Sequence, residues 1–191
     1  RLKWTPAGCG RAMDLKLDVG DSLYCYLDLE NVSVRWAISR GALISASELN
    51  EPNSNPGRFV SHTIASILTH SNTLKFKNEL IVENFRLNKC PEKISRIDGM
   101  YFFIDRDSAL TVSRGLDAWG GHFVESNLHE VLLRNGRYSI YDSQWITYAP
   151  RCSDGLLDES RLEWITKYFE GEPYNENPIW EVLLNGAKYA F

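Results

Sequence analysis

The sequence predicts an α+β fold in which helices pack around a mainly antiparallel, split sheet. Two observations support this prediction. Segments with helical periodicity concentrate in the first half of the chain, whereas short apolar and aromatic runs suited to strands dominate the second half. Two Asn-Gly dipeptides each separate a pair of such runs, and Asn-Gly favours the tight turns that join antiparallel strands.

Length and composition suit one globular domain. The chain has 191 residues, of which 43% are hydrophobic and 24% charged, and its formal net charge is −4. We therefore expect an N-terminal arm over residues 1–21 and a single domain over 22–191. No apolar run approaches the ~20 residues that cross a bilayer, and no signal peptide is visible, so we expect a cytoplasmic protein without membrane contact. The acidic balance argues against a non-specific coat on nucleic acid.

The first half of the chain contains the predicted helices. Ser22–Leu27 is a short apolar run that suits a strand, and it precedes a short helix over Val32–Arg40 that Gly41 ends. Two further segments place apolar residues on one helical face, and these are Ser61–His70 and Leu74–Leu87.

The second half opens with the most apolar strand, Gly99–Ile104, and a helix from Asp107 or Ser108 toward Trp119. Four further strands and one helix are predicted beyond it. The strands form two hairpins: Phe123–Leu133 with Arg137–Tyr141, and Ile179–Leu184 with Ala187–Phe191. The helix carries an apolar stripe made by Leu162, Ile165, Tyr168 and Phe169.

The cysteines do not predict a metal site. Cys9, Cys25, Cys90 and Cys152 lie far apart, whereas zinc sites usually draw on closely spaced ligand pairs. We expect reduced thiols. A Cys25 nucleophile with one of two histidines, His122 or His129, stays open as an alternative enzyme on an unrelated α+β fold, although Cys25 in a strand also suits a core position.

Charged residues gather ahead of the aromatic strand. Glu83 and Arg86 are three positions apart, so they either pair on a helix surface or contribute to a site. Arg96 directly precedes the strand, where side chains end at a sheet rim. A guanidinium fixed at such a rim can hold a phosphate through paired hydrogen bonds.

Glu181 interrupts an apolar run, Pro178-Ile179-Trp180 before it and Val182-Leu183-Leu184 after it. A carboxylate in such a run is costly unless it faces a cleft or a charged partner. Strand alternation places Glu181 on the face opposite Trp180 and Val182. A solvent-facing strand position remains the plain alternative.

Several of these features occur in a fixed order along most of residues 22–191. Leu23-Tyr24 lies in a strand before a short helix, Ser95-Arg96 precedes an aromatic strand, and Ala109 opens the next helix. A Y-x-x-G and then a P-x-x-E-x-L-x-x-G stretch close the series. In this order the sequence resembles the ADP-ribosyltransferase-like proteins of bacteria and phages, in particular the branch near nucleic-acid-modifying toxins.

The resemblance implies an enzyme that transfers ADP-ribose from NAD to a macromolecule, as a toxin, an effector, or a phage or defence enzyme. Glu181 matches the catalytic glutamate of the family. The acceptor would be a protein or a nucleic acid, and an antitoxin or inhibitor would be a further partner. The residues expected to contact NAD are Tyr24, Tyr26, Arg96, Tyr101 and Phe103.

One departure from the family concerns its first strand, which usually supplies a His or Arg after the tyrosine to hold NAD. Here that stretch reads Tyr24-Cys25-Tyr26. Either another arginine takes this role, with Arg40, Arg58 and Arg96 as candidates, or the chain does not use NAD in the usual way. The alternative function is therefore a non-catalytic binding or interaction domain on the same fold, with exposed aromatic residues as anchors.

Overall fold

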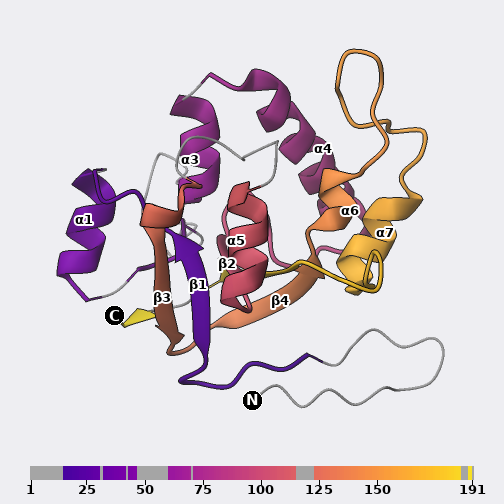
Figure 1. The fold of residues 1–191 in the computed structure, drawn as a ribbon. Coiled ribbons are helices and arrows are strands. Elements are labelled where there is room, and N and C mark those ends of the chain that lie inside the picture. The colour runs from indigo at the N-terminus through magenta and orange to yellow at the C-terminus, as the bar shows by residue number, and fades with distance from the viewer. Residues whose placement is uncertain are drawn as a thin grey trace.

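The computed structural model describes residues 15–30, 32–41, 43–46, 60–69, 71–114, 123–185 and 189–190. An antiparallel sheet forms its centre, with helices around it, which confirms the α+β class (Figure 1). The six strands of the sheet are β1 Ser22–Tyr26, β2 Met100–Phe103, β3 Leu128–Leu133, β4 Arg137–Asp142, β5 Trp180–Asn185 and β6 Tyr189–Ala190. The α-helices are α1 Val32–Ser39, α3 His62–Thr69, α4 Thr73–Lys89, α5 Arg106–Arg114, α6 Gln144–Thr147 and α7 Glu163–Glu170.

The strands lie in the order β4-β5-β2-β1-β3-β6, and each neighbouring pair is antiparallel. Strands β1 and β3 share five registered pairs, and β2 and β5 share four. In contrast, β1 and β2 share a single pair, Tyr24 with Phe103. The sheet is therefore two three-stranded halves joined at a narrow seam.

Both predicted hairpins are wrong. Strand β3 pairs with β1 and β6, and β4 pairs with β5, so three strands separate β3 from β4. The Asn135-Gly136 turn is a connection between the two halves of the sheet. Strand β6 likewise pairs with β3 rather than with β5. The turn preference of Asn135-Gly136 is overridden because β4 pairs with β5 instead of β3. Strand β5 is buried from Trp180 to Leu184, so this pairing removes more apolar surface from water.

The helix predictions are mostly confirmed, with differences near the seam. Helix α5 ends at Arg114, and the predicted continuation toward Trp119 lies outside the described residues. The predicted strand Phe123–Leu133 begins instead with a 3₁₀ turn at Glu125–Asn127. The short helix α6 was not predicted. Within the predicted arm, Leu17 is buried and its backbone N–H donates to the Tyr138 hydroxyl at 2.9 Å, whereas residues 1–14 lie outside the described part.

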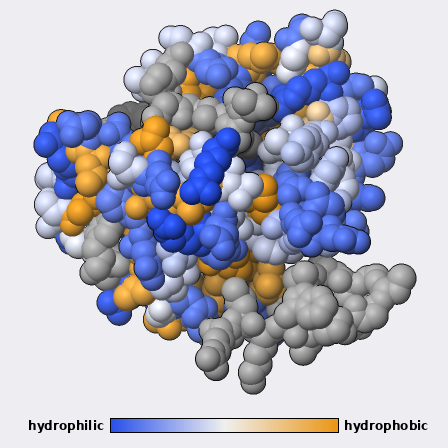
Figure 2. Space-filling view, viewed as in Figure 1, coloured by the Kyte–Doolittle hydropathy of each residue, from blue (hydrophilic) through white to orange (hydrophobic). Residues whose placement is uncertain are grey.

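The core is divided between the two faces of the sheet. One face carries apolar residues of every long strand, such as Leu23, Phe102 and Val182, which pack against Val34 of α1. On the other face, α4 and α7 pack over β4 and β5, and α5 packs near β1 and β2 (Figure 1). The surface in Figure 2 is mainly hydrophilic, with apolar residues scattered in small groups. None of the described helices has the length and apolar character that a membrane crossing requires.

Candidate functional site

A row of side chains crosses four strands on the face that α4, α5 and α7 cover. Tyr141 of β4 is in register with Glu181 of β5, which is in register with Phe103 of β2, which is in register with Tyr24 of β1. Residues directly opposite one another in a sheet point to the same face. The structure therefore brings together three residues that the sequence analysis grouped, namely Glu181, Phe103 and Tyr24.

Glu181 is ion-paired inside the protein rather than exposed. Glu181 is 4% exposed, and Arg96 is fully buried. The Nη1 atom of Arg96 donates to Glu181 Oε1 and, at 2.6 Å, to the Tyr168 hydroxyl. That hydroxyl in turn donates to Glu181 Oε1 at 2.5 Å. Of the alternatives for a carboxylate in an apolar run, the structure thus selects the charged partner.

Glu79 of α4 completes this group, which we call the Arg96 cluster: Arg96, Glu79, Glu181 and Tyr168. Arg96 Nε donates to Glu79 Oε2 at 2.8 Å, and Nη2 donates to Oε1 at 3.1 Å. This two-point geometry is the strongest that a guanidinium and a carboxylate adopt. A buried charge is tolerated when it is paired and hydrogen-bonded, and here one cation serves two carboxylates.

Two aromatic rings enclose the guanidinium. The Arg96 Cζ atom lies 5.0 Å from the ring centroid of Tyr101 and 5.4 Å from that of Tyr168. Both distances suit a cation–π contact. The Tyr101 hydroxyl donates to the backbone carbonyl of Arg96 at 2.8 Å, so Tyr101 fixes both the side chain and the main chain of this residue.

Burial governs the proton affinities of the cluster. It raises the pKa of Glu181, and the Arg96 charge and the Tyr168 hydrogen bond offset this effect only in part. Burial also raises the pKa of Tyr168 well above its usual range. For Arg96 burial opposes the charge, but Glu181 and Glu79 outweigh it and raise the pKa. The site therefore combines a permanent cation with a carboxyl group that takes up a proton more readily than an ordinary glutamate.

Arg96 lies in the core. The sequence predicts a position at a sheet rim, and this prediction is wrong. Four of its N–H···O contacts go to Glu79, Glu181 and Tyr168. A pyrophosphate would have to displace these partners. In this arrangement Arg96 orients Glu181, and the residues present do not fit a phosphate-holding role for it.

The remaining predicted contacts lie around the seam. Tyr26 is 9% exposed, and its hydroxyl donates to the Ala109 carbonyl of α5 at 2.7 Å. Its ring centroid lies 6.4 Å from that of Phe103 and 5.0 Å from that of Phe123. Tyr24 is half-buried beside them. Three of the predicted NAD contacts thus form one aromatic group under α5.

Sequence reasoning missed Glu79 and Tyr168 as polar members of the site. A signal for Glu79 exists in α4, where Glu79, Glu83 and Arg86 recur at helical spacing and are all buried. Glu83 and Arg86 do pair, through contacts of 2.8 and 2.9 Å, but inside the protein instead of on its surface. Tyr168 has no such signal, because it stands in an apolar stripe and its hydroxyl acquires a role only through tertiary contacts.

Cys25 faces His129 across β1 and β3, but its surroundings do not favour a nucleophile. The thiol is 3% exposed, and burial raises its pKa. Thiolate is the reactive form, so a raised pKa suppresses reactivity. Cys25, Cys90 and Cys152 are free, which agrees with the expectation of reduced thiols for the described cysteines.

A scan against protein-family models finds no match to this chain, and a search of curated proteins finds none either. The functional assignment therefore depends on the motifs in the sequence and on the geometry of the Arg96 cluster and the seam.

Proposed function

We propose that the protein is an NAD-dependent ADP-ribosyltransferase that modifies a macromolecular acceptor, with Glu181 as the catalytic carboxylate. The observation that carries the proposal is the row of Glu181, Phe103 and Tyr24 in register across three strands, with the carboxylate fixed by Arg96 and Tyr168. The same proposal includes a role as a toxin, an effector or a defence enzyme that acts in a cytoplasm. It also includes a partner that inhibits the enzyme.

Transfer of ADP-ribose from NAD requires a fixed anion beside a developing cation. The bond between nicotinamide N1 and ribose C1′ breaks, and its electron pair leaves with nicotinamide. Positive charge builds on the ribose as in glycoside cleavage, and a nucleophile of the acceptor then bonds to C1′ and loses its proton. A carboxylate held in place stabilises that charge most strongly where water is excluded. In this scheme Arg96 and Tyr168 are positioning residues, and Tyr24 and Phe103 offer ring surfaces to nicotinamide.

Access to Glu181 requires movement, because the residue is only 4% exposed. Helix α5, which contributes Ala109 to the packing around Phe103, is the cover on the seam side. The proposal therefore includes movement of α5 away from the seam when NAD binds. Movements of covering segments accompany substrate binding in other enzymes.

The test measures release of labelled nicotinamide from NAD with water as the acceptor, so the natural acceptor need not be known. We expect Glu181→Gln to lower the rate by at least about 100-fold. Glu79→Gln is the matched control, since it also removes one carboxylate from Arg96 but leaves Glu181 in place. Thermal unfolding of both variants separates loss of catalysis from loss of the fold. Equal rates in the two variants, or no release by the unaltered protein, would contradict the proposal.

A second candidate is a non-catalytic binding domain, and the burial of the Arg96 cluster favours it. Each charge in the cluster already has a protein partner, as in a structural ion pair. The first strand also lacks the His or Arg that the family uses for NAD. Calorimetry with NAD distinguishes the two candidates: absence of heat and of a thermal shift favours the binding domain.

A further inference from the structure

The three arginines that the sequence offers for holding NAD do not meet the Glu181 face of the sheet with a free guanidinium. Arg96 is engaged within the Arg96 cluster. Arg58 lies outside the described residues. Arg40 follows α1, which packs on the opposite face of the sheet, and its Cζ atom lies 4.6 Å from the ring centroid of Trp36. A cation for the pyrophosphate of NAD must therefore come from elsewhere in the chain.

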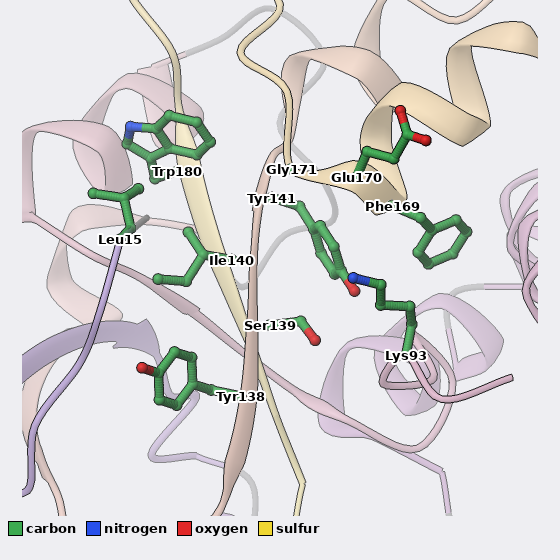
Figure 3. Close-up of a pocket in the computed structure, with 10 residues that line it drawn as sticks. All are labelled: Leu15, Lys93, Tyr138, Ser139, Ile140, Tyr141, Phe169, Glu170, Gly171 and Trp180. Carbon is green, nitrogen blue, oxygen red and sulfur yellow. The ribbon is translucent and has the colours of Figure 1, made fainter. Parts of the chain in front are cut away.

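A cavity of about 210 Å³ along β4 does not supply this cation. Figure 3 shows that Lys93 lines it together with Glu170, so the two charges largely cancel. The cavity also lies on the Tyr141 side of Glu181, whereas the seam between β2 and β1 lies on the other side. The predicted aromatic contacts of NAD are at the seam, and the cation should be there too.

Two arginines of α5 share one carboxylate beside the seam. Arg106 Nη2 lies 3.3 Å from Glu125 Oε1, and Arg114 Nη2 lies 3.8 Å from Glu125 Oε2. All three side chains are more than half exposed, so water weakens both contacts. Two guanidinium groups thus face a single negative charge. A pyrophosphate, which has more charge and more acceptor oxygens than a carboxylate, can displace Glu125 from them.

These arginines lie close to the aromatic group under α5. Helix α5 packs against β1 and β2 (Figure 1), and the Tyr26 hydroxyl donates to the Ala109 carbonyl in the middle of the helix. Burial raises the pKa of Tyr26, and the charges of Glu125, Arg106 and Arg114 act on it as well. Both guanidinium groups therefore lie near the hydroxyl end of Tyr26.

The separation from Glu181 suits one NAD molecule. Tyr24 is two strands away from Glu181, and Tyr26 is two residues further along β1. With strands about 4.8 Å apart and about 3.4 Å per residue, the Cα atoms of Glu181 and Tyr26 lie roughly 12 Å apart. In NAD the pyrophosphate is joined to the nicotinamide ribose through one carbon and one oxygen atom. A ribose beside the Glu181 carboxylate therefore places the pyrophosphate within reach of long side chains near Tyr26.

Two aspartates at the start of α5 also bear on the charge balance. Asp105 accepts from Ser108 N at 2.7 Å and from Ser108 Oγ at 2.8 Å, so its carboxylate caps the helix. Asp107 is exposed in the first turn, where the helix dipole stabilises a negative charge. Arg114 is seven residues beyond Asp107, about 10 Å along the helix axis. In the described part of the chain Glu125 is the carboxylate that contacts Arg114, so Glu125 is the anion that a ligand has to replace.

We propose that Arg106 and Arg114 bind the pyrophosphate of NAD, which replaces Glu125 as the anion between them. This inference rests on the proposed function. When the two guanidinium groups turn to the pyrophosphate oxygens, α5 loses two contacts that tie it to Glu125. That loss favours the movement of α5 that access to Glu181 requires.

The first test measures binding of ADP-ribose, which has the pyrophosphate but no nicotinamide, by calorimetry on the full chain. We expect Arg106→Gln and Arg114→Gln each to weaken binding about tenfold, because each removes a charge-assisted hydrogen bond. Arg161→Gln, at an exposed arginine before α7, is the control and should change binding less than about twofold. Thermal unfolding checks that all three variants are folded. Equal weakening in the three variants would overturn the pyrophosphate site.

The second test reverses the sign. Glu125→Gln should tighten binding of ADP-ribose about threefold, because it removes the anion that competes for the two arginines. Asp107→Asn is the matched control, since it also removes one negative charge next to these arginines but contacts neither of them in the described residues. A long-range effect of charge alone would make the two variants equal, and that result would contradict displacement of Glu125.

Nicotinamide release from NAD separates this inference from the proposed function. We expect Arg106→Gln to raise the KM for NAD about tenfold and to leave kcat within about threefold. Release by the unaltered protein with equal KM values in Arg106→Gln and Arg161→Gln would overturn the pyrophosphate site alone. Arginine-dependent binding of ADP-ribose without any release would overturn the transferase proposal alone. Absence of both binding and release would overturn both.

Discussion

Arg96 and Glu181, which are 85 positions apart in the chain, meet as an ion pair from which water is almost excluded. The pair joins the segment before β2 to the second residue of β5, and it does so through the sheet register that also places Phe103 opposite Glu181. This contact fixes where the carboxylate of Glu181 lies.

Replacing Arg96 should be among the most damaging single changes. Arg96→Met would leave Glu79 and Glu181 buried without their cation, and breaking a buried pair on one side costs about 3–5 kcal/mol. Urea unfolding measures this loss. Arg106→Met is a suitable control, because its ion pair with Glu125 is more than half exposed and contributes less than about 1 kcal/mol. Similar losses in the two variants would show that the cluster is not stabilising.

Tyr168→Phe should separate positioning from charge. The variant keeps the ring beside Arg96 but removes the hydroxyl that donates to Glu181. The hydroxyl also accepts a hydrogen bond from Arg96, so two buried hydrogen bonds are lost, and leaving buried partners unsatisfied costs at least about 1–3 kcal/mol in the free energy of unfolding. If Glu181 is catalytic, nicotinamide release should also fall more in Tyr168→Phe than in Tyr174→Phe, a change at an exposed tyrosine outside the cluster. An unchanged rate in Tyr168→Phe would speak against positioning by this hydroxyl.

The stability of the protein should depend on pH through Glu181. Because burial raises the pKa of Glu181 in the folded state, the folded protein binds this proton more tightly than the unfolded chain does. The contribution is fully present below the ordinary glutamate pKa and is lost as pH rises through the folded value. The difference in unfolding free energy between the unaltered protein and Glu181→Gln should therefore decline as pH rises above about 4.5. A difference that grows with pH would contradict the raised pKa.

Asp142 should hold the segment that leads into β5. Its side chain is fully buried and accepts hydrogen bonds from three backbone N–H groups: Gln144 at 3.0 Å, Tyr174 at 2.8 Å and Ile179 at 3.1 Å. Asp142→Ala should destabilise the protein by about 2–5 kcal/mol, since it leaves buried donors unsatisfied. Hydrogen exchange at residues 174–179 should rise in that variant, and Asp158→Ala, at a half-buried residue whose carboxylate accepts from Ser160, should not change it.

Thiol labelling should follow burial. Cys152 is exposed, whereas Cys25 is buried with a raised pKa. Under native conditions iodoacetamide should modify Cys152 well before Cys25, and denaturant should abolish most of the difference. Peptide mass spectrometry gives the two rates. Fast native modification of Cys25 would revive the alternative of a cysteine nucleophile.

Periodicity and turn chemistry predicted most single elements correctly. The α+β class, the strand at Ser22–Tyr26 and the long helix α4 all follow from apolar spacing. Strand pairing did not follow, because Asn-Gly signals act over a few residues whereas the partners of β3 and β4 are chosen by burial across the whole sheet. For the same reason the cost of Glu181 in an apolar run pointed to a partner, but the identity of Glu79 and Tyr168 as further members required the three-dimensional arrangement.

The interleaving of the two halves of the sheet has a consequence for biosynthesis. One half takes β1, β3 and β6, and the other takes β2, β4 and β5, so the two halves interleave along the polypeptide and each is completed by a late strand, β6 or β5. Neither half can assemble while residues near 180–190 are still inside the ribosome. Contacts of such high sequence separation form slowly. Nascent chains should therefore stay sensitive to protease until synthesis has passed β5, and then become resistant in a single step.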